Sequence, residues 1–210
     1  ITTDGWSIAV SDSSSKIGEV KIGLNADTTI TSKTGNCIGT MVGTKSNVTI
    51  YKGNPGVTMT SDGTAWDAGA IYWASEGTLT IEGGTFTASN AEGSEAAAVY
   101  QKNGTVKISG SSTKLLGNNA LVVKAGDGSN PDSIVTELSA GIYSTKPEES
   151  WLAANKEIHD TDDGMYKVEG PYLVEVTLED GTTTKFDSWF SAFTASTAQY
   201  KNATVKLLKD

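Results

Sequence analysis

The sequence predicts a mainly β protein: a right-handed parallel β-helix with stacked coils of about 27 to 31 residues, followed by a small C-terminal α+β unit. The main observation is that apolar residues recur at this interval until about residue 148. In addition, glycine (23 residues), serine and threonine are abundant and proline is scarce (4 residues), which favours short strands joined by tight turns. A unit of this length cannot bury its apolar face alone and must stack on its neighbours.

The clearest pair of repeats is AIYWASEGTLTIEGGTFT (70 to 87) and AVYQKNGTVKISGSSTKL (98 to 115). Each unit has two apolar residues separated by one polar residue, then a glycine-containing bend and a second short strand. The first apolar position recurs at Val20, Val48, Leu79 and Val106, with Thr136 next in the same frame. A propeller blade or a leucine-rich repeat does not fit this period. An antiparallel sandwich remains an alternative, because short strands at such spacing also occur there.

Two columns of residues follow from stacking the repeats in register. The predicted inner column contains Ile8, Ile38, Ile71, Val99 and Leu121. The next position should face outward, because strand side chains alternate, and it contains Ala9, Gly39, Tyr72, Tyr100 and Val122. We therefore expect Tyr72 and Tyr100 to lie side by side on the surface of adjacent coils.

The position after the tyrosines contains Trp73 and Gln101, together with Thr40. Two polar residues in this column argue against an apolar inward ladder there. The sequence thus predicts a partner-binding face made of Tyr72, Trp73, Tyr100 and Gln101, with aromatic anchors of the kind that supply most of the energy in protein interfaces. The alternative is a surface tyrosine stack that only covers the sheet.

The repeat stops after the segment KPEES (146 to 150), which predicts a β-helix over 1–148 and a small α+β unit over 149–210. The strand pattern LVEVTLED (173 to 180) precedes a helical pattern, and ATVKLLKD (203 to 210) indicates a last strand. Asp187 or Ser188 is suited to cap the helix. Its aromatic residues have the spacing that packs a helix on a sheet, namely Phe186, Trp189, Phe190 and Phe193.

Composition excludes several classes of function. The net charge of -9 argues against a nucleic-acid partner, and the absence of arginine removes the side chain best suited to clamp phosphate or carboxylate ligands. The single cysteine, Cys37, excludes an internal disulfide framework and suggests a small buried hydrophobic residue. No apolar run approaches the length of about 20 residues that spans a bilayer. Because the chain begins at Ile1 rather than methionine, we expect a fragment of a longer protein.

Signals for chemistry are weak, so we predict no enzyme activity, no catalytic residues, no cofactor and no metal. A glycosidase needs two carboxylates in a cleft, yet Glu76 and Glu82 are not repeated in the next coil. The only histidine, His159, lacks a serine in a nucleophile elbow and should be an exposed turn residue. Asp160, Asp162 and Asp163 before Gly164 leave calcium uptake open, although their spacing does not match the EF-hand pattern.

The runs EGTLTIEGGTFTA, NGTVKISG and SAGIYSTKPEESWLA, with the tail TVKLLKD, resemble the β-helical repeat modules of large cell-surface, adhesin-like proteins of gut Gram-positive bacteria. The resemblance implies a secreted, cell-wall-attached protein on the bacterial surface, and some similar proteins bind host immunoglobulins. It also implies a monomeric module within a tandem array, because the tail followed by ITTDGWSIAV reads as a continuous chain into a new coil.

The leading expectation is therefore a noncatalytic module that binds a host protein or glycoprotein, such as an immunoglobulin, through a flat β-helix face. No nucleic acid and no membrane insertion are expected. One alternative is a structural stalk or spacer, which would expose no large aromatic patch. Another is a carbohydrate-binding or carbohydrate-active β-helix domain, which would need a groove with paired acids or coplanar aromatic rings.

Overall fold

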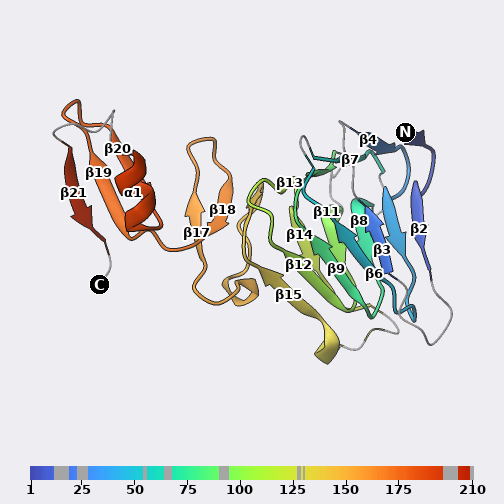
Figure 1. Ribbon diagram of the computed structural model, residues 1–210. Helices are drawn as coiled ribbons and strands as arrows, with labels where there is room; N and C mark the ends of the chain where they lie inside the picture. The colour runs from blue at the N-terminus through green and yellow to red at the C-terminus, as the bar shows by residue number, and fades with distance from the viewer. Residues whose placement is uncertain are drawn as a thin grey trace. The chain divides into compact units, whose positions relative to one another are not determined.

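The computed structural model of the chain describes residues 1–11, 19–22, 28–53, 56–63, 68–89, 95–126, 129, 131–195 and 203–208 (Figure 1). The chain divides into two compact units, Ile1–Glu169 and Gly170–Asp210. The first unit is a parallel β-helix in which successive strands pass in turn to three sheets, here named A, B and C. The predicted fold class is confirmed.

From β1 to β15 each coil contributes one strand to each sheet, so neighbouring strands in a sheet come from consecutive coils. Sheet A contains, in spatial order, β1 (Thr2–Thr3), β4 (Thr29–Ser32), β7 (Thr58–Ser61), β10 (Thr85–Ala88), β13 (Lys114–Gly117), β16 (Gly141–Tyr143), β18 (Tyr166–Glu169) and β17 (Glu157–Asp160). Sheet B contains β14 (Leu121–Val123), β11 (Ala97–Gln101), β8 (Gly69–Trp73), β5 (Ile38–Thr40) and β2 (Ile8–Val10). Sheet C contains β15 (Val135–Leu138), β12 (Thr105–Ile108), β9 (Thr78–Ile81), β6 (Asn47–Ile50) and β3 (Glu19–Ile22).

The register confirms both predicted ladders. In sheet B, Ile38 pairs with Ile8 and Ile71, and Val99 pairs with Ile71 and Leu121. In sheet C the pairs run through the frame read from the sequence, Val20, Val48, Leu79, Val106 and Thr136. The period of the apolar residues therefore determined which residues of consecutive coils lie next to each other.

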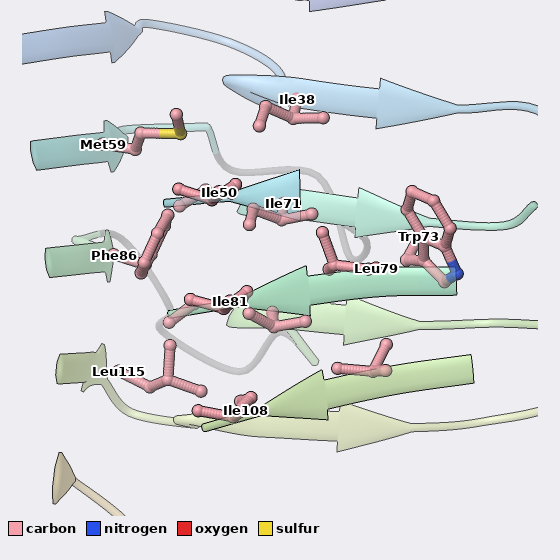
Figure 2. Packing of buried hydrophobic residues seen from close by; sticks show 14 of the residues in the cluster. Ile38, Ile50, Met59, Ile71, Trp73, Leu79, Ile81, Phe86, Ile108 and Leu115 are labelled. Carbon is pink, nitrogen blue, oxygen red and sulfur yellow. The ribbon is translucent and has the colours of Figure 1, made fainter. Parts of the chain in front are cut away.

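The interior is one continuous apolar cluster to which all three sheets contribute. Figure 2 shows Phe86 and Leu115 of sheet A, Ile71 of sheet B, and Leu79 and Ile81 of sheet C facing one another. All five side chains are fully buried. Burying such a side chain stabilises the fold by roughly 1.5–3 kcal/mol, so this packing is the main source of stability of the coil stack.

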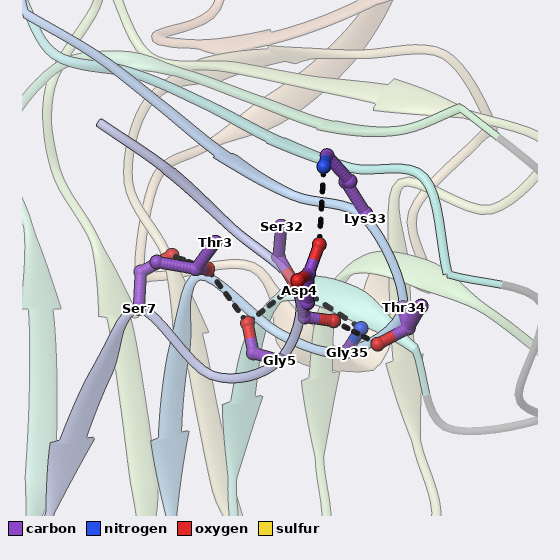
Figure 3. Close-up of polar contacts among 8 residues, drawn as sticks. All are labelled: Thr3, Asp4, Gly5, Ser7, Ser32, Lys33, Thr34 and Gly35. Carbon is purple, nitrogen blue, oxygen red and sulfur yellow. Dashed lines mark hydrogen bonds and ion pairs between the residues drawn. The ribbon is translucent and has the colours of Figure 1, made fainter.

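The corners between sheets A and B are closed by small hydroxyl side chains (Figure 3). Thr3 and Ser32 both donate to the carbonyl oxygen of Gly5, at 2.8 and 2.7 Å, and the Ser32 hydroxyl accepts from the Gly35 amide at 3.1 Å. In the next coil Ser61 donates to the Gly35 carbonyl oxygen. Serine at the end of a sheet A strand thus provides a hydrogen-bond partner for turn carbonyl groups of the preceding coil.

The β-helix extends beyond the predicted boundary at 148, because residues 149–169 close its last coil. Strand β18 pairs antiparallel with β16, and β17 pairs antiparallel with β18, so sheet A continues through this hairpin. A short 3-10 helix, η2 (Glu149–Trp151), precedes Leu152, which forms a bridge with Leu138 of β15. The predicted division into 1–148 and 149–210 is therefore wrong, and the second unit begins at Gly170.

In the second unit an antiparallel sheet contains β20 (Thr183–Phe186), β19 (Val174–Thr177) and β21 (Thr204–Leu207), with one helix, α1 (Trp189–Ala195). Ser188 caps the helix, as expected, by accepting from the Ser191 amide at 3.0 Å. The small core contains Val174, Val176 and Ala192, with Phe186 packed beside it. In the described part of the chain, no helix has the length and apolar character required to span a membrane.

The prediction that the helix packs its aromatic residues on the sheet is wrong for three of them. Trp189, Phe190 and Phe193 are 53%, 78% and 72% exposed. The residue that faces the sheet is Ala192, which is 4% exposed. A helix can lie close to a sheet only where its contact residue is small, so this short helix turns alanine inward and its larger rings outward.

Cys37 lies in the interior, as expected, with its thiol donating weakly to the carbonyl oxygens of Thr60 at 3.2 Å and Ile30 at 3.4 Å. Burial raises the pKa of this thiol to about 11. We expect iodoacetamide at about pH 8 to label the native protein at least about a hundredfold more slowly than the urea-unfolded chain, because the thiolate is the reactive form. Mass spectrometry of quenched samples measures both rates.

The same shift predicts how stability depends on pH. The folded state holds the Cys37 proton more tightly than the unfolded state, whose thiol has an ordinary pKa of about 8.5. The stabilising contribution is therefore complete below that pH and is lost as the pH rises to about 11. Equal iodoacetamide labelling rates in the native and unfolded chains would contradict the raised pKa of Cys37, on which both predictions depend.

Candidate functional site

The predicted partner-binding face has the expected neighbours but is not exposed. Tyr72 and Tyr100 are paired in register between β8 and β11. Their rings are stacked, with centroids 5.8 Å apart, which confirms the predicted tyrosine pair. However, Tyr72 is only 8% exposed and Tyr100 only 1%. They form a small cluster with Ala74 and Val122 that is separate from the main core.

Trp73 was predicted to be displayed, yet it lies inside the main core and has no exposed surface. Figure 2 places its indole ring beside Leu79. Strand alternation explains the inward direction, because Ile71 and Trp73 are two residues apart and therefore share a face. The polar neighbours Thr40 and Gln101 were a misleading signal, since both are buried as well.

Gln101 holds neighbouring segments of the β-helix together and is not exposed to a binding partner. Its side-chain Nε2 donates to the carbonyl oxygens of Gly104 at 2.9 Å and Val135 at 3.0 Å. Its Oε1 accepts from the Thr136 hydroxyl at 2.7 Å. A buried amide with three such partners is satisfied and ties one coil to the next. The predicted site of Tyr72, Trp73, Tyr100 and Gln101 is therefore wrong as an exposed surface.

Two features beside the tyrosines were not found from the sequence. The ring of Trp6 lies so close to Gly39, the residue paired with Tyr72, that a Cβ at position 39 would be 2.6 Å from it. Beyond Tyr100, the carboxylate of Glu95 forms an ion pair with Lys124 at 2.6 Å and lies 3.4 Å from the Tyr100 hydroxyl. Hydrogen bonding from Lys124 lowers the pKa of Glu95. The glycine at position 39 was the sequence signal that another side chain occupies this column.

The outward side of sheet A, among the described residues, carries a regular array of threonines that are exposed or partly exposed. The middle residues of its strands, such as Met59 and Phe86, point into the core, so their neighbours on both sides point outward. These outward positions form two columns of threonine in register, namely Thr29, Thr58 and Thr85 in one column and Thr2, Thr31, Thr60 and Thr87 in the other. We call these seven residues the threonine face. The sequence signal was Thr-X-Thr in three successive coils.

Sheet C presents a more charged outward side. Lys107 of β12 and Glu137 of β15 are paired in register and form an ion pair at 3.0 Å. Thr49 of β6 and Thr80 of β9 lie in the same column. Sheet C therefore offers threonine positions that match those of sheet A in geometry but not in surroundings.

The structure also places the other residues that the sequence raised for chemistry. Glu76 forms an ion pair with Lys45 at 3.7 Å. His159 was expected in an exposed turn, but it lies in strand β17 and is partly buried. Its Nε2 is 4.0 Å from a Glu157 oxygen. In the acidic turn, Thr161 donates to the carboxylate of Asp163 and thereby lowers its pKa. Among the described residues, no group of three or more histidine, cysteine or acidic side chains is placed to hold a metal ion.

The fold and the packing define a parallel β-helix protein with a small α+β unit. No protein-family model, curated protein or solved structure matches the chain.

Proposed function

We propose that the chain is a noncatalytic binding module of the bacterial cell surface, which contacts a host protein or glycoprotein, such as an immunoglobulin, through the threonine face. In this proposal the module acts outside the cell, as one monomeric member of a tandem array. The observation that carries the proposal is the two-column arrangement of seven outward threonines on consecutive coils of sheet A.

Threonine side chains in this arrangement suit contact with a protein. Each offers a hydroxyl group that can donate or accept and a methyl group that makes apolar contact. The β-branched side chain has few rotamers, so ordering it on binding costs little entropy. Stacked strands place equivalent hydroxyls about 4.8 Å apart. A rigid face with regularly spaced polar groups can therefore bind a flat partner surface without rearrangement.

Capture from serum and mucin tests this function when the threonine face is altered. We expect the double substitution Thr58→Lys and Thr85→Lys, two neighbours in one column, to reduce recovery of captured host protein at least about tenfold. The longer charged side chains would hold the partner surface away from the sheet. Recovery is measured by quantitative mass spectrometry of the eluted proteins.

The matched control is Thr49→Lys with Thr80→Lys, which places the same charges at paired positions on sheet C. It should leave capture within about twofold of the unchanged chain, because surface substitutions away from an interface have small effects. If both double variants captured the same proteins as strongly as the unchanged chain, the threonine face would not be the binding surface.

A structural spacer is the second candidate, and the burial of the predicted aromatic site favours it. Tyr72, Trp73 and Tyr100 have at most 8% of their surface exposed, so they stabilise the coil stack instead of presenting anchors. A spacer predicts no specific capture by the unchanged chain from either serum or mucin.

A further inference from the structure

We propose that the open edge of sheet B, at strand β14, accepts an extended peptide by β-strand addition. The three sheets end differently at the last coil. Sheet A continues through β18 and β17, and sheet C is followed by the bridge between Leu138 and Leu152. Sheet B ends at β14, with no further strand among the described residues. An edge strand with unpaired backbone groups is a template for pairing with another chain.

The hydrogen bonds of β14 show which backbone groups are available. Val99 of β11 donates to the carbonyl oxygen of Ala120 at 3.1 Å, and Lys124 donates to that of Gln101 at 2.9 Å. Backbone groups of successive strand residues point to opposite sides, so the Ala120 carbonyl, the Val122 backbone groups and the Lys124 amide turn toward β11. The amide and carbonyl groups of Leu121 and Val123 consequently point away from β11, into the open edge.

A cavity of about 220 Å³ lies next to this edge. Its lining comes from both β14 and the segment that crosses the end of sheet B, namely Asn119, Ala120, Leu121, Tyr143, Thr145, Lys146, Pro147, Glu148 and Trp151. The crossing segment is anchored where the Thr145 hydroxyl accepts from the Ala120 amide at 3.0 Å. Pro147 has no amide hydrogen, so the segment cannot donate to β14 at that position. The chain thus leaves a gap where a ladder partner would lie.

An extended peptide is the partner that matches these features. Donors and acceptors alternate along the edge with the two-residue repeat of a strand, which a second strand complements. The cavity is smaller than the roughly 300–1,000 Å³ of typical small-molecule sites. Its lining is mixed, and the apolar part, from Leu121, Tyr143 and Trp151, suits one inserted side chain. Exposed Lys146 and Glu148 flank the cavity with charges of both signs. We therefore expect a peptide with apolar residues at alternate positions.

The test uses the full chain and a peptide that copies its own ladder. The probe is AAAVYQ, the sequence of residues 96–101, with two added lysines at each end and a fluorescent label. Fluorescence anisotropy should show saturable binding, and hydrogen exchange should show added protection of the Leu121 and Val123 amides. The same peptide, N-methylated at alternate residues, should bind at least about tenfold more weakly because it lacks the ladder donors.

Two substitutions in β14 locate the site. Val123→Pro removes an outward amide at an edge position that tolerates proline, and should weaken peptide binding about tenfold. Val123→Thr keeps the amide and should bind within about threefold of the unchanged chain. Circular dichroism verifies that both variants fold.

The proposal is overturned if the unchanged chain shows no saturable binding at millimolar peptide. It is equally overturned if the N-methylated and unmethylated peptides bind alike, a comparison that needs no variant to fold. Binding should be unaffected by Thr58→Lys with Thr85→Lys, so this result is independent of the function proposed for the threonine face.

Discussion

Replacing Trp73 by alanine is expected to lower the free energy of unfolding by about 3–5 kcal/mol. The indole has no exposed surface and belongs to the main core of the β-helix. Its removal takes apolar area out of the packed interior and leaves a cavity that rigid stacked strands cannot close. Urea denaturation followed by far-UV circular dichroism measures the loss.

Tyr51→Ala is the matched control, because Tyr51 is an aromatic residue of the same unit that is 37% exposed. Its substitution should cost less than about 1 kcal/mol. If Trp73→Ala lowered the free energy of unfolding as little as Tyr51→Ala, Trp73 would lie outside the core. The exposed position predicted from the sequence would then be correct.

Replacing Gly104 by alanine is expected to destabilise the β-helix by about 2–5 kcal/mol, for two reasons that add. Gly104 has a backbone φ of +58°, which L-residues with a side chain rarely adopt. A Cβ at this position would also overlap the carbonyl oxygens of Ser75 and Gly77 in the preceding coil. Neighbouring coils are held at the distance of paired strands, so neither carbonyl can move away without breaking the ladder. Thermal unfolding of the variant provides the measurement.

Gly43→Ala separates the two contributions. Gly43 has a φ of +80°, but a Cβ there would have no atom within 4 Å. Only the backbone term of about 1–2 kcal/mol should therefore appear. If both variants lost the same stability, the close approach of the coils at Gly104 would make no contribution to the destabilisation by alanine.

The neighbours within each ladder could be predicted because they depend on the repeat alone. Once the coil length is known, a residue of one coil lies beside its equivalent in the next, as the pair of Tyr72 and Tyr100 confirms. Exposure could not be obtained in this way. Whether an outward residue meets solvent depends on segments elsewhere in the chain, such as Trp6 over Gly39.

Two further differences have similar causes. The repeat is absent from the segment 149–169, so its sequence suggested a new domain. In the structure, Leu152 and β18 instead complete the last coil of the β-helix. The aromatic pattern of α1 predicted that its rings pack on the sheet, yet the residue that packs there is Ala192. In both cases the partner surface decided which residues are buried, and the local pattern did not contain that surface.

The sequence by itself determined the parallel β-helix, the alignment of its coils and the inward ladders, because a repeat of this period can bury its apolar residues only by stacking. Tertiary structure alone decided that Trp73 and Gln101 point inward, that the Gln101 amide finds hydrogen-bond partners in the next coil, and that the tyrosine pair is covered. It also decided that, among the described residues, sheet B ends at β14. The physical reason is that periodicity fixes the relation between equivalent residues of successive coils, whereas burial depends on everything else that packs against them.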